Sequence, residues 1–344
     1  HADPTWGMGQ RSWAVYGANL FYTRNEDGFG RLICRNVETG VSTEIGKGIY
    51  ESLCAGDGFV AAIRSGAKTP GQIVIYSGDL FERTVIDTVG DYSAYAESLV
   101  EPEVLQIEGV CVRRYMSSNP NGRHLMWVHG GPTDQWQVEW FPKLNYWLSR
   151  GYTIHIPDHR GTTGHGRSFQ QSLLGHWGEH DSDDVARVIR HLGVASENVA
   201  LLGGSAGGMT ALNVAADHPG IAACVIVSYP VTDLEHLAAT SHRFERHSVH
   251  SLVGDAAEMK RRSPINKCPA LASIPLLVLH GDNDPVVPIE QGRAIVDGVR
   301  AVGGTAALEV MSGEGHGFRK PENKKREYTR IEEFLNQHMG TVRP

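Results

Sequence analysis

The sequence predicts an α/β fold, with a mostly parallel sheet covered by helices on both faces, preceded by an all-β segment. Two different patterns of residue types along the 344 residues support this prediction. Up to about residue 112, short runs of β-branched and aromatic residues alternate with turns of Gly, Asn and Asp. From about residue 123, apolar strand-like runs alternate with helical patterns, which is typical of a parallel sheet. We therefore divide the chain into residues 1–112 and 113–344.

The earlier segment repeats one theme of strand, polar turn and strand. The stretches RLICRNVETGVSTEIG (31–46) and QIVIYSGDLFERTVID (72–87) both show it. A β-propeller blade has four strands, so this segment holds material for about two blades, whereas propellers have roughly four to eight. We expect either an incomplete propeller or a smaller sheet on the second domain.

The later segment supplies the elements of the parallel sheet. Expected strands, several of them apolar throughout as in a sheet covered on both faces, cover 124–130, 152–158, 198–205, 222–230, 275–282 and 306–313. Helical patterns cover 138–150, 181–193, 207–218, 289–302 and 323–339. In the last of them, Tyr328, Ile331, Phe334 and Leu335 form a stripe that we expect to face the core.

Composition limits the classes of function. The chain is 41% hydrophobic and 21% charged, with a net charge of −7 spread along its length. This argues against nucleic acid or a polybasic membrane surface as the main partner, and no apolar run is long enough to cross a bilayer. The five cysteines are scattered and contain no C-x-x-C pair, so we expect neither a disulfide framework nor a zinc site. A reducing, cytoplasmic location fits this cysteine usage.

A serine stands among glycines where the expected strand 198–205 ends. The stretch LLGGSAGGMT (201–210) contains G-x-S-x-G, with Ser205 at its centre, which is typical of a nucleophile elbow. In that turn the serine backbone is strained and its neighbours must lack bulk. The alternative is an ordinary Gly-rich turn, because a chain with 40 glycines produces this pattern by chance.

Two later strand ends carry residues that would complete a catalytic triad. A serine hydroxyl needs a base, and His316 lies between two glycines in GEGHGF. The imidazole needs a carboxylate to orient it, and the candidate is Asp284 in HGDNDPVVP, with Asp282 as the alternative. The chain order Ser205, Asp284, His316 is that of α/β-hydrolases, so the fold prediction narrows to an α/β-hydrolase.

The developing oxyanion needs two N–H donors. We expect one to be the amide of Ala206, directly after the nucleophile, and the other to come from the turn at Gly130 and Gly131 in VHGGP. We expect no metal ion and no organic cofactor. The remaining histidines near the motifs have expected structural roles or lack metal-ligand spacing: His129, His155, His159, His165 and His280.

Together these motifs resemble the prolyl oligopeptidase family of serine peptidases. HGGPTDQW, IPDHRGTTGHGRSF, GHWGEHDSDD, GGSAGGMTAL, SYPVTDL, HGDNDPVVP and GEGHGF stand in family order within residues 100–344. The likeness is to the acylaminoacyl-peptidase and dipeptidyl-peptidase branch, which carries HGGP where other branches have a tyrosine as oxyanion donor. The resemblance therefore implies that the Gly131 amide is the second donor rather than His129.

The resemblance also implies how substrates are selected. The family's propeller admits short peptides by size, and its specificity pocket is apolar. The matching positions here are Val231, Leu234 and Val287, with Phe244 as a further member. The alternative is that these side chains pack the edge of the sheet.

These observations lead to three hypotheses about function. The first is a serine peptidase that cleaves short peptides or N-blocked aminoacyl substrates through an acyl-enzyme. The second is an esterase or small-molecule amidase with the same triad, because the pocket and not the acyl-transfer machinery decides the substrate. The third is a non-catalytic, propeller-type binding module.

Family members run longer than this chain and often self-associate. We therefore expect these residues to be the C-terminal part of a larger protein or one piece of a nicked one, with a shortened cap as the alternative. Expected partners are the missing N-terminal part of the propeller and a second copy of the chain in a homo-oligomer.

Overall fold

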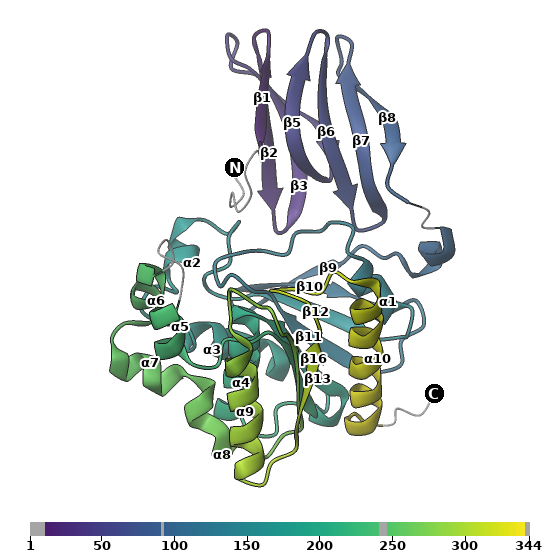
Figure 1. Ribbon diagram of the computed structural model, residues 1–344. Helices are drawn as coiled ribbons and strands as arrows, with labels where there is room; N and C mark the ends of the chain where they lie inside the picture. The colour runs from purple at the N-terminus through teal and green to yellow at the C-terminus, as the bar shows by residue number, and fades with distance from the viewer. Residues whose placement is uncertain (1–10, 91–92, 241–245, 341–344) are drawn as a thin grey trace. The chain divides into compact units, whose positions relative to one another are not determined.

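The computed structural model describes residues 11–90, 93–240 and 246–340, which form two compact units (Figure 1). The first unit takes in the described residues up to Glu103, with Tyr115–Asn119 and Gln135–Arg150. The second takes in Val104–Arg114, Pro120–Asp134 and the described residues from Gly151 onward.

The first unit contains two antiparallel sheets of four strands each. Their strand orders are β1-β2-β3-β4 and β5-β6-β7-β8. The strands are β1 (Trp13–Tyr16), β2 (Asn19–Glu26), β3 (Phe29–Asn36), β4 (Ser42–Lys47), β5 (Ile49–Gly56), β6 (Phe59–Gly66), β7 (Thr69–Ser77) and β8 (Glu82–Thr88). Both expected strand–turn–strand stretches lie in these sheets, so the prediction of an all-β segment with material for about two four-stranded blades is confirmed.

One apolar cluster joins the two sheets. Phe21 and Leu32 from the first sheet and Val60 and Val74 from the second have no exposed surface. Because successive side chains of a strand point to opposite faces, Phe21, Val60 and Val74 alternate with more exposed residues. The 3₁₀ helix η1 (Ser93–Ser98) and helix α1 (Pro142–Leu148) complete the unit.

The large sheet has eight strands in the order β16-β15-β14-β13-β11-β12-β10-β9. The strands are β9 (Glu103–Ile107), β10 (Val110–Tyr115), β11 (His124–Val128), β12 (Thr153–Asp158), β13 (Val199–Gly204), β14 (Cys224–Ser228), β15 (Leu276–Gly281) and β16 (Ala306–Met311). Neighbours from β12 through β16 pair in parallel, which confirms the expected sheet. Since β9 and the first half of β10 precede residue 113, the sheet begins earlier than the division we drew, and that division stays a prediction.

Helices lie on both faces of this sheet. In Figure 1, α4 and α9 lie on one face, and α10 lies on the other, against β14 and β15. The helices of the second unit are α2 (Arg167–Gln171), α3 (His180–His191), α4 (Ala206–Asp217), α5 (Leu234–Thr240), α6 (Arg246–Val253), α7 (Ala256–Arg262), α8 (Cys268–Leu271), α9 (Ile289–Ala301) and α10 (Pro321–His338), with 3₁₀ turns η2 (Ser196–Asn198) and η3 (Pro264–Lys267). None of the helices in the described ranges is long and apolar enough to span a membrane.

The helices differ from the expected ones in two places. The pattern at 138–150 forms a helix only from Pro142, because a proline favours the first helical position and keeps the residue before it extended. That residue, Phe141, has φ −125° and ψ 93°. The short helices α5 to α8 were not predicted. Of these, α5 to α7 carry part of an apolar cluster that includes Leu234, Val249 and Met259, and α8 packs Leu271 into the core of the large sheet.

The core of the second unit lies on both faces of the sheet. Strand residues such as Leu201, Val225 and Val278 have no exposed surface. On α10, Ile331, Phe334 and Leu335 are buried and Tyr328 is half-buried, as the stripe predicted. This packing holds the carboxyl ends of β13 to β16 side by side, where the candidate residues lie.

Candidate active site

Ser205 lies in the sharp turn between β13 and α4. It occupies the N-cap position of α4 with φ +54° and ψ −122°, and its side chain makes no capping hydrogen bond. A non-glycine residue in such a conformation stores roughly 1–3 kcal/mol of strain, which persists only where the surroundings hold it. Here the amide of Ser205 donates to the Ser228 carbonyl (3.0 Å), and the Ser205 carbonyl accepts from the Gly208 amide (3.0 Å).

The glycines around Ser205 are required by close backbone contacts. A Cβ added to Gly203 would lie 2.2 Å from the carbonyl oxygen of Gly207. A Cβ on Gly207 would lie 2.4 Å from the carbonyl oxygen of His129. Both contacts are to backbone, which cannot move aside as the end of a flexible side chain does. The Gly-rich stretch therefore has the geometry of a nucleophile elbow.

Asp284 and His316 are hydrogen-bonded to each other. His316 Nδ1 lies 2.8 Å from Asp284 Oδ2, and the amides of Val286 and Val287 donate to Asp284 Oδ1 at 2.9 and 3.0 Å. Burial alone would raise the pKa of Asp284, but the nearby His280 and His316 imidazoles and the Val287 amide hold it well below its usual range. Asp284 is therefore a carboxylate that accepts a hydrogen bond from the Nδ1–H of His316, which leaves Nε2 of the imidazole for chemistry.

Glu314, a residue that was not predicted from the sequence, stabilises the loop that carries His316. The buried carboxylate of Glu314 accepts hydrogen bonds from the amides of Arg319 and Lys320 and from the Asn323 side chain at 2.8–3.0 Å. On the other side, Gly281 at the end of β15 lies so close that an added Cβ would be 2.4 Å from the Glu314 carbonyl oxygen. The only sequence signal for Glu314 was its place in GEGHGF, two residues before His316.

Tyr229 is a second residue that sequence reasoning missed. It follows β14 with φ +39°, and its ring centroid lies 4.5 Å from that of His316. A Cβ on Gly204 would lie 3.4 Å from the same ring, so Tyr229 lies beside both the elbow and the histidine. Burial, with the nearby Glu327 and Asp284 carboxylates, raises the pKa of Tyr229 to about 12, so its hydroxyl is neutral at ordinary pH.

The two expected oxyanion donors come from different elements. Ala206 is the first residue of α4, so its N–H is one of the four that lack an intrahelical acceptor, at the positive end of the helix dipole. Gly131 lies in the loop after β11 with φ +121°, a conformation that favours glycine. A Cβ on its neighbour Gly130 would lie 3.6 Å from Ser205 Cβ, which brings this loop against the candidate nucleophile.

The expected substrate pocket is an apolar cluster. Val231, Leu234 and Val287 are almost fully buried and pack with Ala206 and Met209. Phe244 lies outside the described residues. This burial also agrees with the alternative, in which these side chains pack the edge of the sheet. Their assignment to a substrate pocket stays a prediction.

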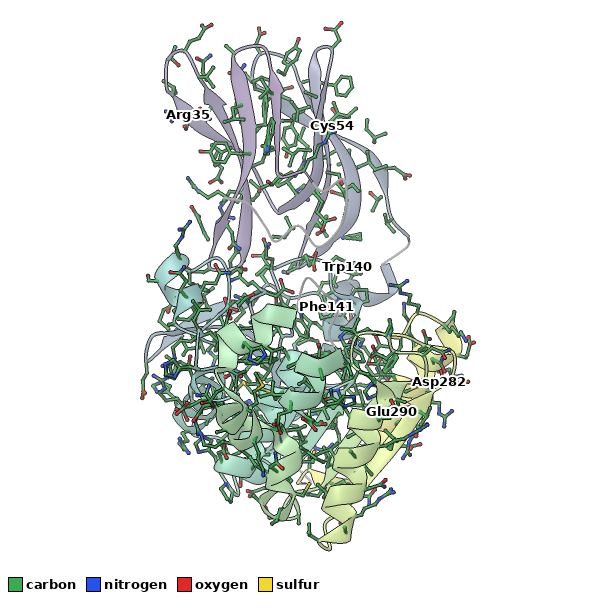
Figure 2. All side chains as sticks on the ribbon, turned by 60° about the vertical axis from the view of Figure 1, so that its left-hand side comes forward. Arg35, Cys54, Trp140, Phe141, Asp282 and Glu290 are labelled. Atoms are coloured by element: carbon green, nitrogen blue, oxygen red, sulfur yellow. The ribbon has the colours of Figure 1, made fainter. Side chains whose placement is uncertain are left out.

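Asp282, the alternative to Asp284, has a different environment. It is exposed, and its Oδ1 accepts a hydrogen bond from the Gly313 amide at 2.6 Å (Figure 2). Asp284 is the aspartate that faces His316. The fully buried His280 donates from Nε2 to the Val287 carbonyl (2.9 Å), so it supports the loop of Asp284, as expected of a structural histidine.

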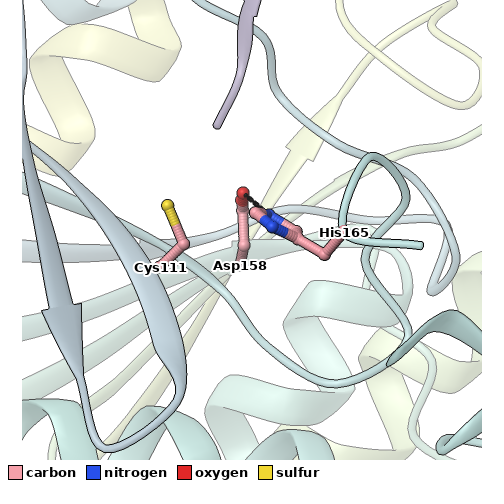
Figure 3. A group of neighbouring side chains, drawn as sticks. All are labelled: Cys111, Asp158 and His165. Atoms are coloured by element: carbon pink, nitrogen blue, oxygen red, sulfur yellow. Dashed lines mark hydrogen bonds and ion pairs between the residues drawn. The ribbon is translucent and has the colours of Figure 1, made fainter. Parts of the chain in front are cut away.

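One group of metal-ligand types lies elsewhere in the described part of the second unit. The ligand atoms of Cys111, Asp158 and His165 lie within 4.8 Å of one another (Figure 3). However, Arg113 donates to both oxygens of Asp158 at 2.6 Å, and His165 Nε2 lies 2.6 Å from Oδ2. The guanidinium of Arg113 would repel a metal cation, and it already occupies both Asp158 oxygens that the cation would need as ligands. The group is therefore better described as a buried ion-pair network than as a metal site.

Comparisons with known proteins show a family that the chain matches and several peptidases that it resembles. The sequence profile of the prolyl oligopeptidase family matches residues 136–342. Dipeptidyl aminopeptidase BIII of Pseudoxanthomonas mexicana is 30% identical over 63% of this chain and 33% of that protein. Acylamino-acid-releasing enzyme 1 of Oryza sativa subsp. japonica is 26% identical over 62% and 30%. The chain thus spans about a third of the length of these curated relatives.

A solved structure matches nearly the whole chain. The puromycin-hydrolyzing peptidase of Mycobacterium tuberculosis superposes with a TM-score of 0.91 and 25% identity. The match covers 98% of this chain and 55% of that one. It therefore extends over both units, including the blade-like sheets.

Proposed function

The chain belongs to the prolyl oligopeptidase family, and from this membership we propose that it is a serine peptidase that cleaves short peptides or N-blocked aminoacyl substrates at Ser205. The observation that carries the proposal is the His316–Asp284 hydrogen bond, at the same edge of the sheet as the strained Ser205. Acyl transfer needs a serine nucleophile, a histidine that acts as general base and a carboxylate that orients this histidine.

The reaction runs through two tetrahedral intermediates. Nε2 of His316 takes the hydroxyl proton as Ser205 Oγ attacks the substrate carbonyl carbon, and Asp284 stabilises the imidazolium. The amides of Ala206 and Gly131 bind the oxyanion. His316 then gives the proton to the leaving amine, and the C–N bond breaks to form an ester with Ser205. Water, deprotonated by His316, attacks this ester, and the protonated His316 then gives its proton to Oγ of Ser205 as the ester bond breaks and the acid is released.

The test compares wild type with Ser205→Ala on three chromogenic substrates: an acetyl-aminoacyl amide, a free-amine dipeptidyl amide and a simple acyl ester. We expect the wild type to cleave one or both amides. In the variant this activity should fall to the residual rate that substrate binding and the oxyanion donors alone supply. Preference for one amide indicates which kind of N-terminus is accepted. If Ser205→Ala keeps most of the amide activity, the assignment of the nucleophile is wrong.

A second candidate function is a small-molecule amidase. The structural neighbour from Mycobacterium tuberculosis hydrolyses puromycin, an aminoacyl amide of a nucleoside, and shares both units of this chain. Adding puromycin as a fourth substrate separates the two candidates. Serine-dependent cleavage of puromycin without cleavage of the peptide amides favours the amidase, and cleavage of the ester alone favours an esterase.

We also propose a reducing, cytoplasmic location and self-association. The first is supported by the five cysteines, none of which forms a disulfide, and by the exposed thiol of Cys54 (Figure 2), because an oxidising compartment threatens an exposed thiol. The second is supported by an exposed edge strand, β8, at the end of its sheet. Fractionation of the source cells tests the location, and sedimentation velocity tests the association.

A further inference from the structure

The first unit contains a cavity that the mechanism above does not use. Its volume is about 220 Å³, and all of its lining residues belong to that unit. Most of them come from the starts of β3 and β7 and the ends of β4 and β6. Four cationic side chains line the cavity: Arg31, Lys47, Arg64 and Lys68. Among the described lining residues, Glu101 is the one carboxylate.

Arg31 differs from the other three cations in its partners. Its Nε lies 3.4 Å from Glu26 Oε2 and 3.5 Å from Glu44 Oε2, so carboxylates offset its charge. Within the described ranges, the other three cations have no carboxylate at ion-pair distance: Lys47, Arg64 and Lys68. Since both lysines are exposed, the cavity is accessible to a solute.

Neutral acceptors hold Arg64 in place. Its Nε donates to the Lys47 carbonyl oxygen at 2.8 Å, and its Nη1 donates to Gln72 Oε1 at 3.3 Å. Because neither acceptor is charged, the guanidinium is positioned while its positive charge is left uncompensated. Its Nη2 makes no hydrogen bond to the described part of the chain, so this nitrogen is available to a ligand.

Bare backbone forms the wall between the cations. Gly48, between β4 and β5, has φ +132°, and its amide donates to the Gly30 carbonyl oxygen at 3.0 Å. A Cβ on Gly48 would lie 2.7 Å from the Ser65 carbonyl oxygen, and a Cβ on Gly30 would collide with the Gly48 carbonyl. Neither position accepts a side chain, so this part of the cavity stays open.

Gathering these cations costs free energy unless an anion offsets their charges. Arg31 and Lys47 lie directly opposite each other in the β3–β4 pair, and like charges in that arrangement destabilise a sheet. The three unpaired cations and Glu101 leave a net charge of +2 in the cavity. A phosphate group carries about −1.5 to −2 near pH 7, whereas a single carboxylate carries about −1. A phosphate therefore compensates the cavity more fully than a carboxylate does.

We propose that this cavity is a binding site for a phosphate group, either free inorganic phosphate or the phosphate of a monoester. Arg64 donates to its oxygens through Nη2, and Lys47 and Lys68 donate through their ammonium groups, the donor types that phosphate accepts in proteins. The cavity has room for such a group, since one water molecule needs only about 10–15 Å³. Binding needs no turnover at Ser205, so this inference and the proposed function can fail separately.

Titration calorimetry of the full chain in a chloride buffer tests the site with inorganic phosphate, glycerol phosphate and acetate. We expect saturable phosphate binding at one site per chain, and about tenfold weaker binding of acetate, which brings less charge and fewer acceptors. Binding of both phosphate compounds identifies a site that accepts monoesters, and binding of inorganic phosphate alone identifies the free ion as the occupant. No saturable binding of either compound, or acetate binding as tight as that of phosphate, would overturn the inference.

Arg64→Gln and Lys68→Gln each remove one cation from the cavity. We expect each to raise the Kd for phosphate on the order of tenfold, because a charge-assisted hydrogen bond is lost. Lys68 is exposed, so its replacement leaves the fold intact even if Arg64→Gln disturbs the contact with the Lys47 carbonyl.

Arg35→Gln is the matched control. Arg35 is an exposed cation of β3 that bonds to Ser42 Oγ and lies outside the cavity lining (Figure 2). Its removal should leave the Kd for phosphate within about twofold of wild type, because solvent and salt screen a distant charge. A Kd that rises as much in Arg35→Gln as in Lys68→Gln would overturn the site, since phosphate would then respond to overall charge alone.

Glu101→Gln should act in the opposite direction. Glu101 is exposed and brings a negative charge to the cavity, so its removal relieves repulsion of the anion. We expect the Kd for phosphate to fall roughly fivefold, as for the loss of one like charge a few ångströms away in a solvated setting. An unchanged or higher Kd in Glu101→Gln would overturn the placement of phosphate in this cavity.

Discussion

Ser205 adopts a backbone conformation that few residues other than glycine adopt, and its glycine neighbours allow the chain to turn there. Gly203 and Gly207 lie where the backbone of α4 and of the His129 loop leaves no space for a Cβ. The positive φ of Ser205 is held by backbone hydrogen bonds to Ser228 and Gly208. The strained backbone conformation of Ser205 is therefore possible because the glycines beside it have no Cβ that would clash.

Gly207→Ala should disrupt this turn. Its Cβ would lie 2.4 Å from the His129 carbonyl oxygen and 2.5 Å from that of Val128, so the backbone must shift. We expect loss of activity and a lower melting temperature, measured by active-site titration and calorimetry. Gly66→Ala is the control, since its Cβ meets open space. Equal behaviour of the two variants would contradict the steric argument.

Asp284→Asn should separate the two candidate aspartates. An amide in place of the carboxylate no longer stabilises the imidazolium of His316, and it favours the wrong tautomer, so kcat should fall about 10⁴-fold, as in other triads. Asp282→Asn should stay within a few-fold of wild type, because the Asp282 side chain is exposed and accepts a hydrogen bond from the Gly313 amide, whereas His316 pairs with Asp284. Steady-state kinetics of both variants checks this, and a larger loss in Asp282→Asn would exchange the two roles.

Residues with a motif were predicted from the sequence, and residues without one were not. Ser205, Asp284 and His316 lie in Gly-rich strand ends that are recognisable from local pattern. Tyr229 is an ordinary residue in sequence. Its contact with His316 joins segments that are far apart along the chain, so only the fold brings it into view.

Among the elements, the parallel strands decide where the candidate residues meet. Gly204 pairs with Ser228, and Ser228 with Leu279, so β13, β14 and β15 end at one edge. These strands and the long helices were predicted because their apolar patterns extend over many residues. The short helices α5 to α7 have no such pattern, and their structure depends on packing in the cluster around Leu234 and Val249.

The buried ion pair of Arg113 and Asp158 links β10 to β12 within the large sheet. Both side chains are fully buried and make two bonds of 2.6 Å. Removing one partner leaves an uncompensated charge, so Arg113→Met should cost about 3–5 kcal/mol of unfolding free energy. Replacing both, in Arg113→Met with Asp158→Leu, should restore much of that loss. Urea unfolding of the single and double variants measures the coupling.

A surface pair provides the control for this cycle. Lys267 and Asp217 lie 2.7 Å apart, but Asp217 is 42% exposed, so Lys267→Met should cost only about 0–1 kcal/mol. If Arg113→Met costs no more than Lys267→Met, the buried pair does not stabilise the sheet as described.

The stability of the chain should depend on Asp158 at acid pH. Burial by itself would raise the pKa of Asp158, but Arg113 and His165 hold it well below its usual range. The unfolded chain, with an aspartate pKa of about 3.9, therefore binds the proton first as pH falls. The contribution of this group to stability is complete above about pH 4 and declines below it. Unfolding free energies of wild type and the double variant should converge as pH falls below 4, and parallel curves would contradict this.

At the scale of the whole molecule, each of the two compact units has its own apolar cluster. The blade-like unit leaves β8 at the end of its sheet, with Val85 and Ile86 42% and 56% exposed. An edge strand of this kind presents unpaired backbone groups and apolar side chains, which favours pairing with another strand.

Ile86→Lys should therefore weaken self-association, because a charge on an edge strand opposes pairing with a second copy. Sedimentation velocity over a wide range of protein concentration measures it, and hydrolysis by the two proteins should be equal. Val37→Lys is the control, since Val37 is 61% exposed but lies in a turn outside the named strands. A wild-type chain that stays monomeric throughout would contradict the prediction.

The sequence by itself determined the fold class, the family and the residues that we propose for the triad, because each depends on a local pattern: periodicity, glycine spacing and the order of motifs. The tertiary structure decided which residues hold those groups in place, namely Glu314 behind His316 and Tyr229 beside it. The physical reason is that orientation depends on hydrogen bonds and contacts between residues distant in sequence, and these have no periodicity that the chain alone reveals.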